Sequence, residues 1–164
     1  MEIHVYREGD DDPDKCTARR LEKDDSVTVH SSYDRLPTGT LLDPFAERAL
    51  SPADSSPVVA VDSSWESADT VFDDLGRGYE RRALPYLVAV NPVNYGKPFR
   101  LNTAEAVGAA VYVLGDEELS RRLLSYFSYG ETFLQLNREP LERYAECEDS
   151  EEVVAVQEEY LSKR

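Results

Sequence analysis

Two short apolar runs separated by a helical segment constrain the fold of this chain most. Residues 57–61 and 82–89 read PVVAV and RALPYLVA, which is close to continuous apolar character instead of alternation. That pattern is typical of strands buried on both faces of a sheet. Residues 64–75 lie between them, have helical character, and are followed by the helix-ending Gly76 and Gly78. A unit of this kind predicts parallel strands joined by a right-handed crossover.

The remaining pattern divides the chain into an α/β part and a helical part. Further strands are predicted at residues 3–6, 27–30 and 39–42. After Gly96 the apolar residues recur at helical spacing, first from Ala104 to Leu114, with Asn102 or Thr103 as the N-cap. Later helical pieces span 119–127 and 133–144, with a break expected at Pro140, and a last helix follows Asp149. We therefore predict an N-terminal parallel-sheet α/β domain, residues 1–85, and a C-terminal all-α domain, residues 86–164.

The charge of the chain bears on its partners. The net charge is −15 at pH 7, with only four lysines among the 18 basic residues and with the acidic residues scattered. A lysine-poor acidic surface fits a halophilic protein, because high salt screens self-repulsion. An RNA partner therefore stays possible, and the local placement of arginine matters more than the total charge.

No targeting or metal-binding pattern stands out. The chain has no apolar stretch of membrane-spanning length, and its first residues, MEIHVYREGDDD, lack the character of a signal peptide. We therefore expect a cytoplasmic protein that does not contact membranes. Cys16, Cys147, His4 and His30 do not have the spacing of metal ligands, so no metal is expected.

The tetrad Asp62-Ser63-Ser64-Trp65 follows the fourth predicted strand. Ligands of parallel sheets gather beyond the carboxyl ends of strands, where Asp62 could accept hydrogen bonds or a proton from a ligand. Alternatively, Asp62 or a neighbouring serine caps the following helix. Trp65 and Ala68, one turn apart, could form a flat apolar slot, although a single tryptophan is more often part of a core.

Two helix starts could bind anions. The backbone amides at Thr103 could hold a carboxylate or phosphate, or simply belong to an ordinary cap. At the start of the segment 14–21, Thr17 could donate to an anion and Lys15, Arg19 and Arg20 could meet phosphates; the alternative is a solvated amphipathic helix. Further basic residues in the middle of the chain indicate where an RNA track is to be sought: Arg77, Arg81, Arg82, Lys97, Arg100, Arg121 and Arg122.

Several motifs together carry a resemblance to a known family. In order they are Lys15-Cys16-Thr17, Leu42-Asp43-Pro44, the tetrad at 62–65, Leu84-Pro85, AVNPVNYG at 89–96 and LNTAEA at 101–106. The chain resembles the small-subunit ribosomal RNA aminocarboxypropyltransferases in an archaeal-type short form. The resemblance implies transfer of the 3-amino-3-carboxypropyl group of S-adenosylmethionine to a ring nitrogen of a modified uridine, such as N1-methylpseudouridine, with release of methylthioadenosine. It also implies a trefoil knot like that of the knotted (SPOUT-class) RNA methyltransferases, and a monomer.

The same resemblance implies roles for individual residues. Thr17 and Thr103 would grip the methionine carboxylate, and Val61 would meet the ribose through its carbonyl. Leu84 and Phe99 would hold the adenine through their backbone, and Trp65 and Ala68 would bury the sulfonium methyl group. Asp62 is the candidate general base. The small-subunit RNA, or a pre-ribosomal subunit, would meet the basic residues Lys15, Arg19, Arg20, Lys97 and Arg100.

Two other functions are compatible with these residues. A fold does not determine which group is transferred, so an RNA methyltransferase that releases S-adenosylhomocysteine is one alternative. The other is a non-catalytic ribosome-assembly factor that keeps the pocket only as structure. The combination of Thr17, Trp65 and Thr103 favours a working site.

Overall fold

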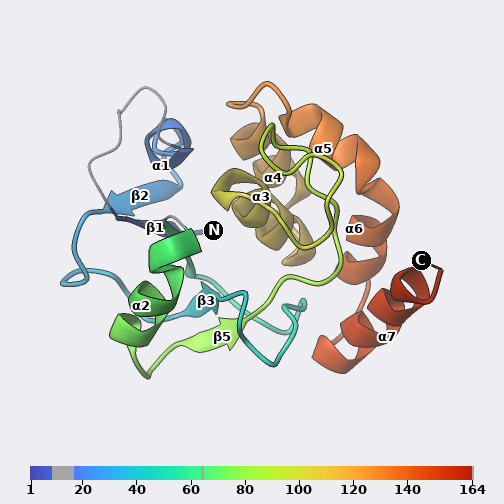
Figure 1. The fold of residues 1–164 in the computed structure, drawn as a ribbon, viewed down its shortest axis with the longest axis horizontal. Helices are drawn as coiled ribbons and strands as arrows, with labels where there is room; N and C mark the ends of the chain where they lie inside the picture. Colours follow the sequence, from blue (N-terminus) through green and yellow to red (C-terminus); the bar gives the residue numbers. More distant parts are fainter. Residues whose placement is uncertain (9–16, 64, 164) are drawn as a thin grey trace.

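The computed structural model describes residues 1–8, 17–63 and 65–163, and it describes residues 65–69 by their backbone alone. The strands are β1 (Ile3–Arg7), β2 (Val27–His30), β3 (Thr40–Leu42), β4 (Val58–Asp62) and β5 (Glu80–Arg82). The helices are α1 (Thr17–Leu21), α2 (Trp65–Leu75), α3 (Thr103–Val113), α4 (Glu117–Leu124), α5 (Gly130–Leu136), α6 (Arg138–Ala145) and α7 (Ser150–Leu161). The expected order of an α/β part followed by helices is confirmed (Figure 1).

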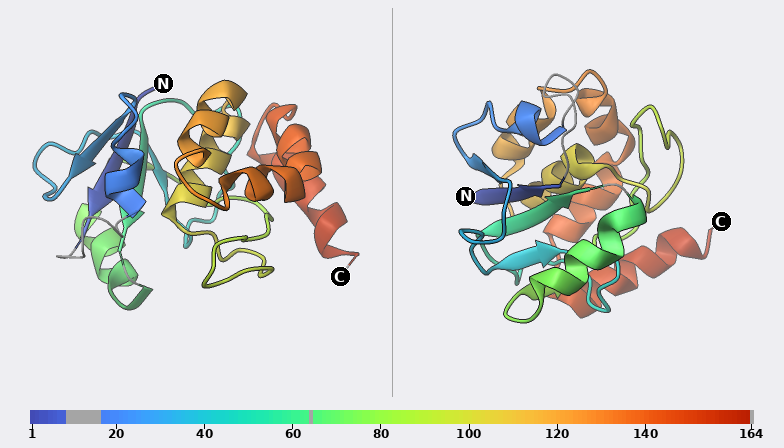
Figure 2. Two further views of the ribbon diagram at one scale, coloured as in Figure 1. Left: turned by 90° about the horizontal axis from the view of Figure 1, so that it is seen from above. Right: turned by 60° about the vertical axis from the view of Figure 1, so that its left-hand side comes forward.

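The described strands form one parallel sheet of order β2-β1-β4-β3-β5. Alternate residues of β4 serve opposite faces, as strand geometry requires. Val58 and Ala60 join the core shared with the C-terminal helices, whereas Val59 packs with Val71 and Phe72 of α2. The sheet therefore lies between α2 and the helical part of the chain (Figure 2, right). Because every strand runs the same way, all their carboxyl ends meet at one edge.

The fifth strand differs from its prediction. It covers only Glu80–Arg82, and residues 83–102 form a long loop, apart from single bridges of Ala49 with Ala83 and of Val88 with Pro98. Leu87 of the predicted strand, and Val90 just after its end, are buried in the core shared with the helices and not in a strand of the sheet. An apolar run has the same sequence pattern in a buried strand and in a loop that is buried under helices. For this reason the run at 82–89 resembled a strand.

Helix ends follow the expected capping residues with one correction. Asn102 caps α3 and Asp149 caps α7, each through its side chain. The break expected at Pro140 lies at Asn137 instead, and Pro140 is the third residue of α6. Proline is tolerated in a first helical turn because its missing N–H would have no partner there.

One buried cluster joins the two parts of the chain. It contains Ile3 and Val58 of the sheet, Val107 of α3, Leu123 of α4 and Val153 of α7. Hence α3 packs directly on β4 and on α1. No helix in the described part of the chain is long and apolar enough to cross a membrane.

Candidate active site

A cavity of about 460 Å³ opens at the carboxyl edge of the sheet. Residues 42–44, 61–63 and 83–85, which follow β3, β4 and β5, line one side of it. The other side comes from residues 101–103 at the start of α3, from Phe99, and from Val154 and Gln157 of α7. A cavity of this size, beyond the carboxyl ends of parallel strands, is in the usual range and position for a small-molecule site.

The cavity brings together most of the residues predicted for cofactor binding. The residues of this set that line it are Thr17, Val61, Leu84, Phe99 and Thr103, and the candidate base Asp62 lines it too. The side chains of Trp65 and Ala68 lie outside the described atoms, although the backbone of α2 begins at Trp65, two residues after the lining residue Ser63. Lys15 lies outside the described residues. A cavity therefore lies beside the 62–65 tetrad, which is where the sequence predicted a site.

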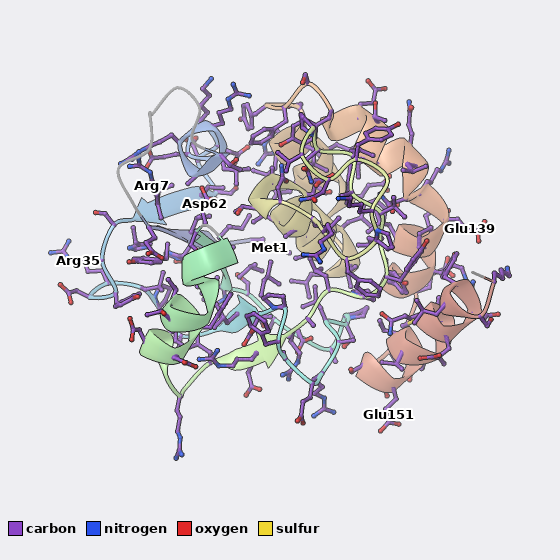
Figure 3. The ribbon with its side chains drawn as sticks, in the orientation of Figure 1. Met1, Arg7, Arg35, Asp62, Glu139 and Glu151 are labelled. Atoms are coloured by element: carbon purple, nitrogen blue, oxygen red, sulfur yellow. The ribbon has the colours of Figure 1, made fainter. Side chains whose placement is uncertain are left out.

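Asp62 joins the starts of two helices. One carboxylate oxygen accepts a hydrogen bond from the backbone N–H of Ala18 in α1, at 3.1 Å. The other accepts from the Thr103 hydroxyl in α3, at 3.0 Å. Figure 3 shows Asp62 between these two helices. Through its bond with Ala18, Asp62 acts as a capping residue for α1.

Side-chain hydrogen bonds organise the start of α3. Asn102 accepts from the N–H of Glu105 at 2.9 Å, and its side-chain amide donates to the hydroxyl of Tyr129 at 2.6 Å. Burial raises the pKa of Tyr129, which keeps this hydroxyl neutral. First-turn amides carry the positive end of the helix dipole, so an anionic part of a ligand is favoured near Thr103.

Partly buried ion pairs hold the loops around the cavity. Arg81 donates to Asp43 at 2.9 Å and to the carbonyl oxygens of Phe72 and Gly76 at 2.8 and 2.6 Å. Arg82 donates to Asp54 at 2.9 Å. These two arginines, which were candidates for an RNA track, therefore join β5 to the neighbouring loops and to the end of α2.

The other basic candidates lie outside the cavity lining. Arg19 pairs with Glu22 at 2.9 Å, and the guanidinium of Arg20 lies 5.9 Å from the centre of the Phe127 ring. Lys97 and Arg100 are exposed on the long loop that leads to Phe99 and α3. These basic residues are neighbours in sequence of residues that line the cavity. Arg19 and Arg20 follow Thr17 in α1, and Lys97 and Arg100 lie on either side of Phe99 in the loop.

Sequence reasoning missed the contribution of α7. Val154 and Gln157 line the cavity, and Gln157 accepts from the backbone N–H of Tyr86 at 2.9 Å. The amphipathic pattern of residues 150–161 predicted a helix with a buried side, but that pattern does not say what the buried side covers. No group of three potential metal-ligating side chains occurs among the described side chains of residues 1–8, 17–63 and 70–163.

Comparison with protein families gives two matches. Residues 40–161 match a family described as ribosome biogenesis protein, C-terminal. Residues 1–31 match a family described as a possible Fer4-like domain in RNase L inhibitor. Iron–sulfur clusters of this type are held by four cysteine thiolates, and Cys16 is the single cysteine of that segment. Residues 1–31 therefore lack the four cysteines that such a cluster needs.

Individual proteins match over nearly the whole chain. A 16S rRNA aminocarboxypropyltransferase of Halobacterium salinarum is 56% identical over 98% of this chain and 97% of its own length. One of Methanosarcina acetivorans is 45% identical over 97% of this chain and 94% of its own length. The solved structure of the SAM-dependent rRNA:acp-transferase Tsr3 from Vulcanisaeta distributa has 34% identity and a TM-score of 0.82, covering 99% of this chain and 96% of that one. The chain therefore belongs to the family of 16S rRNA aminocarboxypropyltransferases.

Proposed function

We propose that this protein transfers the 3-amino-3-carboxypropyl group of S-adenosylmethionine to a ring nitrogen of a modified uridine, N1-methylpseudouridine or a similar base, in small-subunit ribosomal RNA. The carbon–sulfur bond breaks as the nitrogen–carbon bond forms, and its electrons leave with sulfur in neutral methylthioadenosine. The observation that carries the proposal is the cavity at the carboxyl edge of the sheet, where two helix starts meet at Asp62. The membership of the chain in the family supports it.

The residues around the cavity fit S-adenosylmethionine. We assign the methionine carboxylate to Thr17 and Thr103, because helix starts favour anions. The backbones of Val61, Leu84 and Phe99 would hold the ribose and the adenine, and all three residues line the cavity. We assign the sulfonium methyl to Trp65 and Ala68, because an indole face attracts a cationic centre. Burying the methyl would leave the propyl carbon as the position open to attack.

The role of Asp62 follows from its hydrogen bonds. The ring nitrogen loses a proton in the reaction, and Asp62 is our candidate to receive it. Both of its oxygens already accept hydrogen bonds from α1 and α3. Because two donors from different helices already hold this carboxylate in place, these contacts favour a positioning role over proton transfer.

The remaining parts of the proposal concern partners and topology. We propose that small-subunit RNA, free or in a pre-ribosomal subunit, approaches the cavity past α1 and the loop before α3, and that the protein acts as a monomer in the cytoplasm. We also propose a division into domains near residue 85 and a trefoil knot in the chain. The proposal of a knot rests on the resemblance of the chain to the aminocarboxypropyltransferase family.

Labelled S-adenosylmethionine tests the function. The protein is incubated with small-subunit RNA from a strain that lacks it, using cofactor labelled separately in the methyl and the carboxypropyl carbons. Carboxypropyl label in the RNA, with methylthioadenosine released, is the expected result. Methyl label would make the protein a methyltransferase, and cofactor binding without transfer to RNA or to an assembling subunit would leave a non-catalytic assembly factor. Thr103→Val should lose incorporation, whereas Thr28→Val, at an exposed position of β2, should keep it.

A further inference from the structure

The loop formed by residues 91–100 exposes apolar side chains beside the cavity. Val93 is 84% exposed and Tyr95 is 66% exposed. Phe99, in the same loop, is also exposed and lines the cavity. The loop projects from the body of the molecule in both views of Figure 2. Large apolar groups held in water next to a cavity indicate a surface that contacts another molecule.

Hydrogen bonds fix the 91–100 loop in one conformation. The side-chain oxygen of Asn91 accepts from the N–H groups of Val93 and Asn94, at 3.2 and 3.0 Å. The N–H of Gly96 donates to the carbonyl of Ala89 at 2.7 Å, and that of Lys97 to the carbonyl of Asn94 at 3.0 Å. These bonds close a tight turn at the tip of the loop. Tyr95 is therefore presented on a rigid support.

Glu105 anchors this turn from inside the protein. It is fully buried, and its carboxylate accepts from the side-chain amide of Asn91 and from the N–H of Val90, both at 2.6 Å. Burying a carboxylate is costly unless several donors compensate it. This anchor therefore holds the loop in place while Val93 and Tyr95 at its tip stay exposed. A pre-formed surface also loses less conformational freedom on binding.

The charged residues of the loop indicate which class of molecule it would bind. Residues 81–104 contain no aspartate or glutamate, in a chain that has 33 acidic residues. Lys97 and Arg100 are both exposed on the loop. An acid-free segment that combines an exposed aromatic ring with exposed cations suits single-stranded nucleic acid, in which bases stack on aromatic rings and phosphates meet cations.

We propose that Tyr95 is a stacking platform for an unpaired RNA base adjacent to the nucleotide that enters the cavity, and that Lys97 contacts a phosphate of the same strand. The inference rests on the proposed function and extends it, because it names the element that would recognise the RNA. The loop connects the two sites directly, since Tyr95 is four residues from Phe99 at the cavity wall. It predicts a preference for single-stranded over duplex RNA around the target.

Binding of a single-stranded fragment of small-subunit RNA, measured over a series of salt concentrations, tests this proposal. Tyr95→Ala should weaken binding about tenfold at every salt concentration, leaving the salt slope unchanged, because stacking releases no counterions. Tyr95→Phe keeps the ring and should bind like the wild type. Lys97→Ala should lower the slope of log affinity against log salt by about one. The same fragment annealed to its complement should bind more weakly than the single strand.

Two controls separate this proposal from the proposed function. Cofactor affinity should be equal in Tyr95→Ala and the wild type, because Tyr95 does not line the cavity. Unchanged RNA affinity of Tyr95→Ala, while the wild type still transfers the carboxypropyl group, would overturn the platform and point to a protein partner for the loop. Loss of transfer by the wild type with normal cofactor binding would instead overturn the function.

Discussion

Asp62 connects the sheet to the starts of two helices. It ends β4, and its two oxygens connect α1 and α3, which are far apart in sequence. The sequence left open whether Asp62 binds ligand, accepts a proton or caps a helix. Its hydrogen bonds show a capping role, for α1. The geometry of the proposed carboxylate site therefore depends on Asp62 even if it never accepts a proton.

Replacing Asp62 distinguishes positioning from proton transfer. In Asp62→Ala the N–H of Ala18 and the hydroxyl of Thr103 lose their acceptor, so we expect about 2 kcal/mol lower stability and about tenfold weaker S-adenosylmethionine binding. Asp62→Asn keeps the shape and one acceptor, and should recover most of the affinity. Denaturant unfolding and calorimetric titration measure both effects. Asp25→Asn, at an exposed position, is the control.

The opposite result has a clear meaning. If Asp62→Asn bound the cofactor normally but lost turnover at every pH, Asp62 would be the base. If turnover in Asp62→Ala and Asp62→Asn instead fell in proportion to cofactor affinity, a positioning role would be confirmed.

At the scale of elements, Glu105 determines the path of the loop before α3. As the third helical residue it completes a capping box with Asn102. The structure adds the contacts with Val90 and Asn91. Asn137 holds the same loop from the other side, accepting from the N–H of Val88 and donating to its carbonyl. These side chains supply the partners that a sheet would have supplied to residues 83–90.

Removing Glu105 should loosen this loop before the rest of the protein. Glu105→Ala leaves several buried donors without an acceptor, so we expect a loss of about 3 kcal/mol of stability. Hydrogen exchange should accelerate at Val90 and Asn102 first, while the amides of β1 and β4 keep their protection. Glu117→Ala, which removes only an exposed ion pair with Arg121, should cost less than about 1 kcal/mol. Uniform acceleration across the sheet would contradict a local anchoring role.

At the scale of the whole molecule, Arg122 connects the helical part to the sheet. It donates from α4 to the buried carboxylate of Asp24, before β2, at 2.6 Å. This hydrogen bond, helped by those from Ser26, lowers the pKa of Asp24 to about 2, against the opposing effect of burial. Arg122 was a candidate for an RNA track, but in the structure it pairs with Asp24 and joins α4 to the segment before β2.

The pair predicts how stability depends on pH. The pKa of Asp24 is lower in the folded than in the unfolded chain. The contribution of the Asp24–Arg122 pair to the free energy of unfolding is therefore complete above about pH 4, and it is lost as the pH falls towards 2. Arg122→Gln should therefore reduce stability by at most about 2 kcal/mol at pH 7, and the difference should shrink across that window. Arg121→Gln, an exposed neighbour, is the matched control. A pH-independent difference in unfolding free energy would exclude this account.

The net charge of −15 makes a second prediction at this scale. Self-repulsion should destabilise the fold at low ionic strength, so the melting temperature should rise with KCl, by about 5 °C or more towards molar concentrations. Near pH 4.5, the isoelectric point, the repulsion is small and most of the salt effect should disappear. A melting temperature independent of KCl at pH 7 would argue against a halophilic adaptation.

The sequence by itself determined the local features of this protein. Strands at 3–6 and 27–30, the caps at Asn102 and Asp149, and candidate residues after β4 all follow from hydrogen bonding and periodicity between near neighbours. Such interactions are the same wherever the segment lies in the fold. Several residues at strand ends and helix starts line the cavity, and their roles in binding stay predictions.

Only the tertiary structure decided which distant partners meet. The run at 82–89 is buried by helices, Arg81 and Arg122 meet buried carboxylates, and Gln157 of α7 reaches the cavity. A buried apolar residue or a basic residue has the same local pattern whatever it contacts. Its partner depends on the path of the chain, because burial and ion pairing join residues by their positions in space and not by their separation in sequence.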